Sequence, residues 1–278
     1  MSFESKSATQ FMDFSLARRL ELVSAESGRA CGESTAALHP AAAVAIEEIA
    51  GGIAVFAGKD SPVTQAIGVG MRGPVEESEL DRLEDFYRSR GAATAIELCP
   101  LVEPAFYESF ARRAFRLAEV SNILVCEIAA LDRAFLAARP EGIAVRIAAR
   151  GEASLWTETV AQGFAGEVAI TPAILEVMDG FFHAPGSTPF LAFTDGAVAG
   201  GGSAYLRDGV AGFFGASTLP AFRRRGVQTA LLAARLGWAI EQGCDLAKGI
   251  TLPGSSSQRN HERFGFRVAY TRTKLLRE

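Results

Sequence analysis

The chain repeats itself at an interval of about 151 residues, and this repeat limits its architecture more than any other feature. The segment Gly265-Phe266-Arg267-Val268-Ala269 near the C-terminus is similar to Ala114-Phe115-Arg116-Leu117-Ala118 in the first half. A glycine expected to end a helix recurs at residues 91 and 243, and a proline after a short apolar strand recurs at residues 100 and 253. Because an ordered series at a nearly constant interval is typical of duplicated units, we predict two homologous halves.

We expect the two halves to be domains of residues 14–138 and 142–278, joined near Ala138-Arg139-Pro140-Glu141-Gly142. A chain of 278 residues is long for one compact core and short for three, which agrees with two modest domains. One α/β domain whose units look alike only in composition stays open as the alternative.

Composition and charge exclude several classes of protein. The chain is 49% hydrophobic and 22% charged, which excludes a largely disordered protein. A net charge of -4 and a pI near 5.6 argue against nucleic acid as a partner. The four cysteines lie far apart and there are only three histidines, so we expect no metal site. No stretch reaches the roughly 20 apolar residues that span a membrane, and no signal-peptide pattern stands at the N-terminus. We therefore expect a cytoplasmic protein without a membrane partner.

The second half shows a readable series of elements. Strands are predicted at residues 143–149, 190–194, 197–205, 210–218, 246–250 and 266–275, and helices at residues 153–163, 171–182, 228–242 and 255–264. Asp195-Gly196 predicts a two-residue hairpin turn. Thr171-Pro172, and Ser255 with Gln258, are typical helix beginnings. The order β-α-α-β-β-β-α-β-α-β predicts a mixed α/β fold.

One segment, residues 218–232, carries the clearest chemical signal. A strand ends, a basic loop follows that contains three arginines and Gly226, and a helix begins. Backbone N–H groups and the positive end of the helix dipole would meet there, which suits a pyrophosphate. Gly226 would let a ligand approach the backbone, and the arginines could meet phosphate oxygens. Alone, such a loop is equally well interpreted as a solvated arginine cluster.

This segment resembles the acyl-CoA-binding motif of the GNAT acyltransferase superfamily, R/Q-x-x-G-x-G/A. Arg223 and Gly226 match the motif, whereas Gln228 replaces its second glycine. The order of elements and the closing Phe264-Gly265-Phe266 also resemble this family. The resemblance covers about residues 142–278 and, in the first half, only the later elements. It implies two tandem GNAT-like domains, each a splayed mixed β-sheet flanked by helices.

The resemblance implies that acetyl-CoA binds as co-substrate in the opening of the second half's sheet. Backbone groups at residues 217–219 would pair with the pantetheine arm, and N–H groups at residues 224–229 would hold the pyrophosphate. Gln228 could point its side chain away while its N–H still donates. The predicted donor-binding residues are Ser217, Thr218, Leu219, Arg224, Arg225, Gly226, Val227, Gln228, Thr229 and Asn260.

The catalytic residues are less clear from the sequence. Members of the family commonly place a tyrosine acid four residues before the glycine of the G-F signature, and His261 stands there. An imidazole could carry that proton, so His261 is the candidate catalytic residue, although a solvated helix histidine stays open. Tyr205 could line the acceptor cleft or simply be a half-buried strand aromatic. No general base can be assigned.

The first half lacks the phosphate-binding loop. At the corresponding position Pro74 removes a donor N–H, and Glu76 and Glu77 would repel a pyrophosphate. Ser78, with Asp81, is predicted to cap the following helix. We therefore expect a degenerate half that has lost CoA binding and walls the acceptor cleft.

These observations favour an N-acetyltransferase that acts on a primary amine, with a small molecule as the expected acceptor. A non-catalytic acyl-CoA-binding or regulatory protein is the alternative, since a base and the tyrosine are missing. A P-loop enzyme is excluded, because no Lys-Ser/Thr follows the glycine. Nothing in the sequence identifies the acceptor or the oligomeric state.

Overall fold

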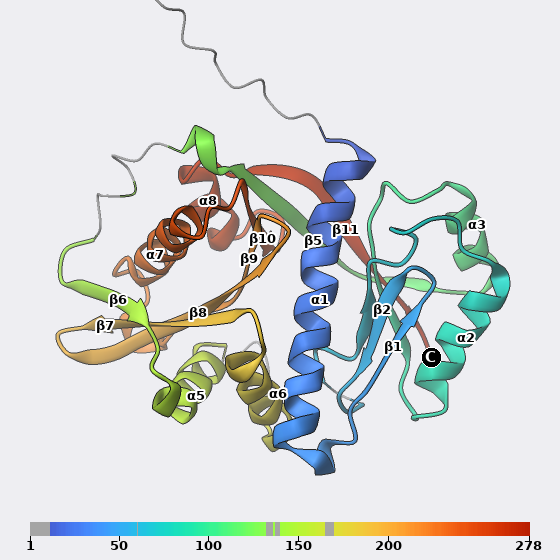
Figure 1. The fold of residues 1–278 in the computed structure, drawn as a ribbon, viewed down its shortest axis with the longest axis horizontal. Coiled ribbons are helices and arrows are strands. Elements are labelled where there is room, and N and C mark those ends of the chain that lie inside the picture. The colour runs from blue at the N-terminus through green and yellow to red at the C-terminus, as the bar shows by residue number, and fades with distance from the viewer. Residues whose placement is uncertain (1–11, 60, 132–135, 137–139, 165–169) are drawn as a thin grey trace, which may run out of the picture.

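The computed structural model describes residues 12–59, 61–131, 136, 140–164 and 170–278 (Figure 1). Its strands are β1 (Ala45–Ile49), β2 (Gly52–Phe56), β3 (Gln65–Ile67), β4 (Thr94–Leu98), β5 (Arg116–Glu127), β6 (Ile143–Ile147), β7 (Ser187–Thr194), β8 (Ala197–Arg207), β9 (Val210–Thr218), β10 (Leu246–Thr251) and β11 (Arg267–Arg277). Its helices are α1 (Phe14–Leu38), α2 (Glu77–Arg88), α3 (Ala105–Arg112), α5 (Ala153–Gly163), α6 (Pro172–His183), α7 (Val227–Glu241) and α8 (Ser256–Arg263). Within these residues all strands join one mixed sheet in the order β1-β2-β3-β4-β11-β5-β10-β9-β8-β7-β6.

The element order predicted for the second half is confirmed from β6 to β11. Local signals act as expected. Asp195 and Gly196, with φ of 53° and 80°, form the tight turn between β7 and β8. The Thr171 side chain accepts a hydrogen bond from the Ile174 N–H at the start of α6, and the Ser255 hydroxyl accepts one from the Gln258 N–H at the start of α8.

The internal repeat is also visible in the structure. The series α2-β4-α3-β5 of the first half recurs as α7-β10-α8-β11 in the second. In each half two consecutive strands pair in parallel. These are β3 and β4 in the first half, and β9 and β10 in the second. Part of the predicted join, residues 138 and 139, lies outside the described residues, so the domain boundaries stay a prediction.

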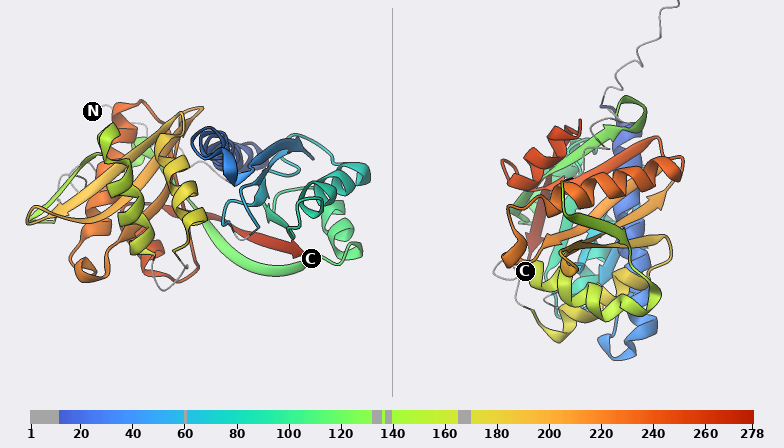
Figure 2. Two further views of the ribbon diagram at one scale, coloured as in Figure 1. Left: turned by 90° about the horizontal axis from the view of Figure 1, so that it is seen from below. Right: turned by 90° about the vertical axis from the view of Figure 1, so that its left-hand side faces the viewer.

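The two halves exchange strands at the centre of the sheet. β11, from the end of the chain, lies between β4 and β5 of the first half and is antiparallel to both. β5, from the first half, in turn pairs with β10 of the second half. Figure 2 shows β5 and β11 as the two long strands that bridge the halves. The exchange gives each half a neighbour along an edge that would otherwise be open to another chain.

The hydrophobic cores follow this exchange. Tyr270 of β11 packs into the cluster formed mainly by α1, α2 and β4. Leu124 and Cys126 of β5 pack into the cluster formed by α7 and β8 to β10. Each half therefore completes the core of the other.

Helices cover the sheet in a way that separates two faces of the second half. α7 and α8 lie on one face, and α5 and α6 lie on the other (Figure 1). α1 lies in the crease between the halves, where it contacts β2, β9 and α6. Its packing on α6 is close, because a Cβ on Gly180 would lie 1.9 Å from the Thr35 hydroxyl oxygen.

One predicted helix start was wrong. α2 begins at Glu77, and its N-cap is Glu76 rather than Ser78, which lies inside the first turn. The Glu79 carboxylate accepts a hydrogen bond from the Glu76 N–H at 3.3 Å. An acidic capping arrangement two residues earlier thus prevails over the serine, since acidic groups favour the positive end of a helix.

The four cysteines are buried free thiols. Among the described helices, none has both the length and the apolar character that crossing a bilayer requires. In the same part of the chain, no group of three His, Cys, Asp or Glu residues gathers as metal ligands would.

Candidate functional site

A cleft opens where β9 and β10 diverge. The two parallel strands are paired only from Val210 to Gly212 and from Leu246 to Lys248. Beyond these residues they separate and leave a cleft of about 800 Å³, which we call the donor cleft. Its floor and walls come from β9, β10, the loop before α7, and the first turns of α7 and α8. The predicted donor-binding segment therefore lies at a real opening in the sheet.

The loop before α7 presents unpaired backbone donors. The first amide of this helix to find a carbonyl is that of Ala230, which donates to the Gly226 oxygen at 3.0 Å. In the described structure, the N–H groups of residues 224–229 donate to no protein acceptor. Arg224, with φ of 63°, and Gly226, with φ of 89°, are both left-handed, which curls this stretch into an anion-binding concavity.

Gly226 is required for a reason that differs from the one the sequence suggested. A Cβ at this position would lie 3.0 Å from Cβ and Cγ of Pro140, so it would point toward the segment before β6. The left-handed φ adds a second constraint, because L-residues adopt it only at a cost. The glycine therefore shapes the loop, and its missing side chain makes room for Pro140.

The three arginines of the loop behave differently. Arg223 donates to the carbonyls of Gly163 and Thr218 and so ties the loop to α5 and β9. Arg225 pairs with Asp195 at 3.3 Å and does not line the cleft. Arg224 lines the cleft and makes no ion pair with any described residue. Of the three, the Arg224 side chain is placed best to meet an anion.

Gln228 links α7 to α8. Its amide donates to the Ser257 hydroxyl at 3.0 Å and accepts from the Asn260 amide at 2.7 Å. The side chain is thus turned toward α8, while the backbone N–H of Gln228 has no acceptor. Asn260 also accepts from Arg263 at 3.0 Å. Asn260 lines the cleft, but both ends of its amide already have partners, which indicates a structural role for that side chain.

The strand side of the cleft is formed by the end of β9. A β-bulge interrupts the β8–β9 ladder between the Gly201–Ser217 and Ser203–Phe214 pairs, and Gly215 there has φ of 61°. Bulges of this kind commonly lie beside active sites, where they redirect backbone groups.

The three predicted positions at the end of β9 differ in their availability. Ser217 and Thr218 line the cleft. Leu219 does not line the cleft. Both of its backbone groups already have partners, because its N–H donates to the Ala199 carbonyl and its carbonyl accepts from the Phe222 N–H, both at 2.9 Å. The predicted donor-binding residues that do line the cleft are Ser217, Thr218, Arg224, Gly226, Val227, Gln228, Thr229 and Asn260.

His261 lies on α8 at the inner wall of the cleft and is buried. Its Nδ1–H donates to the Ser257 carbonyl at 2.8 Å, which leaves Nε2 as the unprotonated nitrogen. The ring rests on the Cα of Gly249, where any Cβ would lie 2.7 Å from Nε2. Burial lowers the pKa of His261 to about 4, so the free protein holds a neutral imidazole at pH 7.

Arg235 is a cleft residue that the sequence interpretation missed. Its side chain is 1% exposed, and it forms no ion pair in the described structure. It donates to the carbonyls of Leu231 and Ser203, and its guanidinium lies 4.9 Å from the centre of the Phe213 ring. Burial lowers its pKa to about 10. An arginine on the apolar stripe of the helix at residues 228–242 was the available signal.

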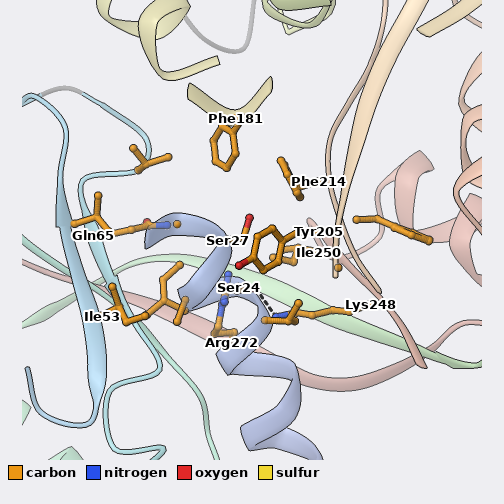
Figure 3. A pocket seen from close by; sticks show the side chains of 18 residues that line it. Ser24, Ser27, Ile53, Gln65, Phe181, Tyr205, Phe214, Lys248, Ile250 and Arg272 are labelled. Carbon is orange, nitrogen blue, oxygen red and sulfur yellow. Dashed lines mark hydrogen bonds between the residues drawn. The ribbon is translucent and has the colours of Figure 1, made fainter. Parts of the chain in front are cut away.

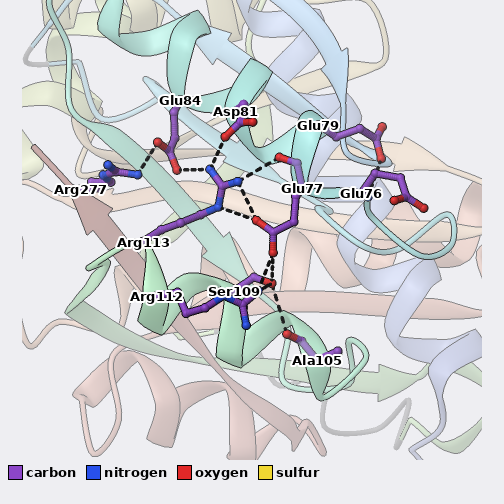
Figure 4. A network of polar contacts seen from close by, with 10 residues as sticks. All are labelled: Glu76, Glu77, Glu79, Asp81, Glu84, Ala105, Ser109, Arg112, Arg113 and Arg277. Carbon is purple, nitrogen blue, oxygen red and sulfur yellow. Dashed lines mark hydrogen bonds and ion pairs between the residues drawn. The ribbon is translucent and has the colours of Figure 1, made fainter.

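The corresponding helix start of the first half carries ionised carboxylates. At the start of α2, Glu77 accepts hydrogen bonds from Ser109 at 2.7 Å, Arg113 at 2.6 Å and Arg112 at 2.7 Å (Figure 4). These bonds lower the pKa of Glu77 to about 2. A carboxylate that stays ionised at this helix start would repel a phosphate.

Comparison with known proteins agrees with this geometry. Residues 155–266 match the family model described as the acetyltransferase (GNAT) family. A GCN5-related N-acetyltransferase from Kribbella flavida has a similar fold, with a TM-score of 0.64 and 18% identity over 89% of this chain and 95% of that one. No curated protein matches the chain.

Two further solved structures resemble the chain. A tandem GNAT protein from the clavulanic acid biosynthesis pathway aligns with 95% of this chain and 93% of its own, with a TM-score of 0.57 and 13% identity. A GCN5-related N-acetyltransferase from Sphaerobacter thermophilus aligns with 82% of this chain and 81% of its own, with a TM-score of 0.57 and 14% identity. At such identities the likeness concerns the fold.

Proposed function

We propose that this protein, in which residues 155–266 form a domain of the GNAT acetyltransferase family, transfers an acetyl group from acetyl-CoA to a primary amine. The observation that carries the proposal is the row of unpaired N–H groups at residues 224–229, which opens onto the cleft between β9 and β10. Pyrophosphate binds well to such a row at the beginning of a helix.

The charge of the donor cleft supports an anionic ligand. Among its described lining residues there are four arginines and no Asp or Glu. The end of β9 faces the cleft along an edge that β10 has left, so its backbone groups can pair with the amides of a pantetheine arm. An extended ligand with a pyrophosphate at one end and amides along its length fits this arrangement.

In the proposed reaction the neutral amine nitrogen attacks the thioester carbonyl carbon. A C–N bond forms, the C–S bond breaks, and CoA leaves as a thiolate that takes up a proton, while the amine loses one. Arg235 would stabilise the negative charge that develops in the cleft, since a buried cation acts strongly in a low-dielectric site. His261 is the proposed proton carrier, and negative charge near its ring would raise its low pKa.

Thermal denaturation with acetyl-CoA tests the donor site. A ligand that binds only the folded state at 100 times its Kd adds about 2.7 kcal/mol, which is a shift of several degrees. We expect Arg224→Glu to abolish most of this shift. The matched control is Arg150→Glu, because Arg150 is exposed, makes no ion pair with a described residue and does not line the cleft, so the shift should stay in place. No shift in the wild-type protein at millimolar acetyl-CoA would contradict the assignment of this site.

Release of free CoA with a panel of amines tests the reaction itself. Turnover of any amine supports an acetyltransferase. The alternative, a non-catalytic acyl-CoA-binding protein, is favoured by the lack of a carboxylate base among the described residues of the donor cleft. Tight binding of acetyl-CoA without CoA release across a broad panel would establish that alternative.

A further inference from the structure

A second cavity lies in the crease between the two halves (Figure 3). We call it the crease cavity; α1, β2, β3, β9 and β10 supply most of its walls, and its volume is about 210 Å³. It contains residues of both halves, for example Ser24 and Gln65 of the first and Tyr205 of the second. Pockets for drug-sized ligands are commonly about 300–1,000 Å³, so this cavity suits a smaller molecule.

The crease cavity meets the donor cleft at the point where the sheet opens. Phe213 and Phe214 of β9 and Ile250 of β10 line both spaces. A molecule in the crease cavity therefore lies against residues that also form the inner end of the donor cleft. This is where an acceptor amine has to stand to attack a thioester held between β9 and β10.

The charges of the crease cavity are all positive. Its charged lining residues, within the described structure, are Lys248 and Arg272. Arg272 is compensated, because it pairs with Glu97 at 2.9 Å and Glu21 at 3.4 Å. A polyamine or an aminoglycoside brings several positive charges, and no carboxylate on this wall would compensate them.

Lys248 makes no direct ion pair with any described residue. Its side chain is 1% exposed, and no carboxylate lies within ion-pair distance of it in the described structure. Its ammonium donates to the Ser24 hydroxyl at 2.5 Å and to the Leu20 carbonyl. Because an ammonium has three donors, one remains for a ligand. Figure 3 shows Lys248 and Ser24 together on the cavity wall.

Nearby buried carboxylates only partly offset the burial of Lys248. Burial lowers its pKa to about 7, Arg272 adds to this effect, and Glu21 and Glu97 partly oppose it. A carboxylate bound beside it would favour the charged ammonium and repay the loss of hydration. The rest of the cavity is mainly apolar, with hydroxyls from Ser27 and Tyr205 that make no side-chain hydrogen bond to a described residue.

We infer that the crease cavity holds the acceptor and that the acceptor is a free amino acid with an apolar side chain. Its carboxylate pairs with Lys248, its side chain packs on the apolar walls, and its amine faces Phe214 and Ile250 at the opening to the donor cleft. This inference rests on the proposed function. It makes Lys248 a specificity-determining residue for that reaction.

The test compares amino acids with the amines that lack only their carboxylate. CoA release is measured with L-phenylalanine, L-leucine and L-methionine, with phenethylamine and isopentylamine, and with spermidine and kanamycin. We expect kcat/KM to be at least about tenfold higher for an amino acid than for its decarboxylated partner. Spermidine and kanamycin should give no turnover above the rate of hydrolysis.

Lys248→Met then tests the residue, because methionine keeps the length of the side chain and removes its charge. We expect KM for the best amino acid to rise at least about thirtyfold, the usual range when one member of a buried charge pair is lost. The kcat/KM for the matching amine should change less than about threefold. Lys59→Met, which removes an exposed lysine outside the cavity, should leave both unchanged.

Three results would overturn the inference. The decarboxylated amines could be used as well as the amino acids, the polyamines could be the better acceptors, or Lys248→Met could lower kcat equally for both classes, which would indicate a general base. If Lys248→Met does not fold, 3-phenylpropionate replaces it as the probe. It should inhibit the wild-type enzyme competitively against L-phenylalanine, whereas 3-phenylpropanol should not, and equal inhibition by both would contradict the role of the carboxylate.

Failure of this inference is distinguishable from failure of the proposed function. Protection by acetyl-CoA in thermal denaturation depends on the donor cleft and not on the crease cavity. Protection by acetyl-CoA together with neither turnover nor protection by any amino acid would refute the acceptor class while leaving the donor site intact.

Discussion

Replacing Gly226 with alanine is a sharp test of how the donor site is built. The backbone there has φ of 89°, and such a left-handed conformation costs an L-residue about 1–2 kcal/mol. Alanine recovers part of this, about 0.5–1 kcal/mol, because it also restricts the unfolded chain. The new Cβ would in addition lie 3.0 Å from two carbons of Pro140, tighter than ordinary packing. We therefore expect a net loss of about 1–2 kcal/mol in the free energy of unfolding.

This loss should appear in two measurements. The Tm should fall by about 2–8 °C in thermal denaturation, given about 2–4 °C per kcal/mol for a chain of this size. The loop can escape the strain by leaving its left-handed conformation, which disperses the N–H groups of residues 224–229. Calorimetric titration should then show acetyl-CoA binding weakened about tenfold, which corresponds to about 1.4 kcal/mol.

Gly237→Ala in the same helix is the matched control. A Cβ at Gly237 meets no atom within 4 Å apart from the helix's own backbone, and the residue lies in the interior of α7. The same change should there stabilise the protein by about 0.5–1 kcal/mol and leave the Kd for acetyl-CoA unchanged. Unchanged Tm and Kd in Gly226→Ala would refute the argument that this glycine shapes the phosphate-binding loop.

The remaining predictions concern stoichiometry and the buried groups of the cleft. Calorimetry should give one acetyl-CoA per chain, because the ionised Glu77 at the first half's corresponding helix start would repel a pyrophosphate; two equivalent sites would contradict this. His261→Ala should lower kcat about 10²-fold with little change in CoA affinity, and an unchanged kcat would remove it from the mechanism. The pKa of His261 is about 4 in the folded protein and about 6.5 in the unfolded chain, so the unfolded chain binds more protons between these two pH values. The free energy of unfolding should therefore fall as the pH drops through that window, by at most about 3 kcal/mol. The fall should be smaller in His261→Asn. Arg235→Met should lower kcat at least about tenfold while the Tm stays within about 3 °C, and a kcat like that of the wild type would exclude a role for its charge.

Features that depend on short stretches of sequence could be predicted from the sequence alone. The repeat, the order of elements from β6 to β11 and the turn at Asp195-Gly196 follow from local periodicity and from residues with special backbone preferences. The position of the loop before α7 follows in the same way, since a strand, a glycine and a helix start are all local signals. The resemblance of this loop to the GNAT motif agrees with the GNAT family model that matches residues 155–266.

The tertiary structure decided which distant groups meet. The exchange of β5 and β11 has no local signal, because either strand could pair with its own half and only the completed sheet selects the partner. Likewise, the packing of Pro140 on the Gly226 position joins segments about 85 residues apart. The contact of Lys248 with α1 joins segments more than 220 residues apart. A buried cation such as Lys248 or Arg235 looks like an ordinary surface residue in a sequence, since its burial is a property of the elements that fold over it. The site's chemistry therefore depends on long-range packing, which local propensities do not encode.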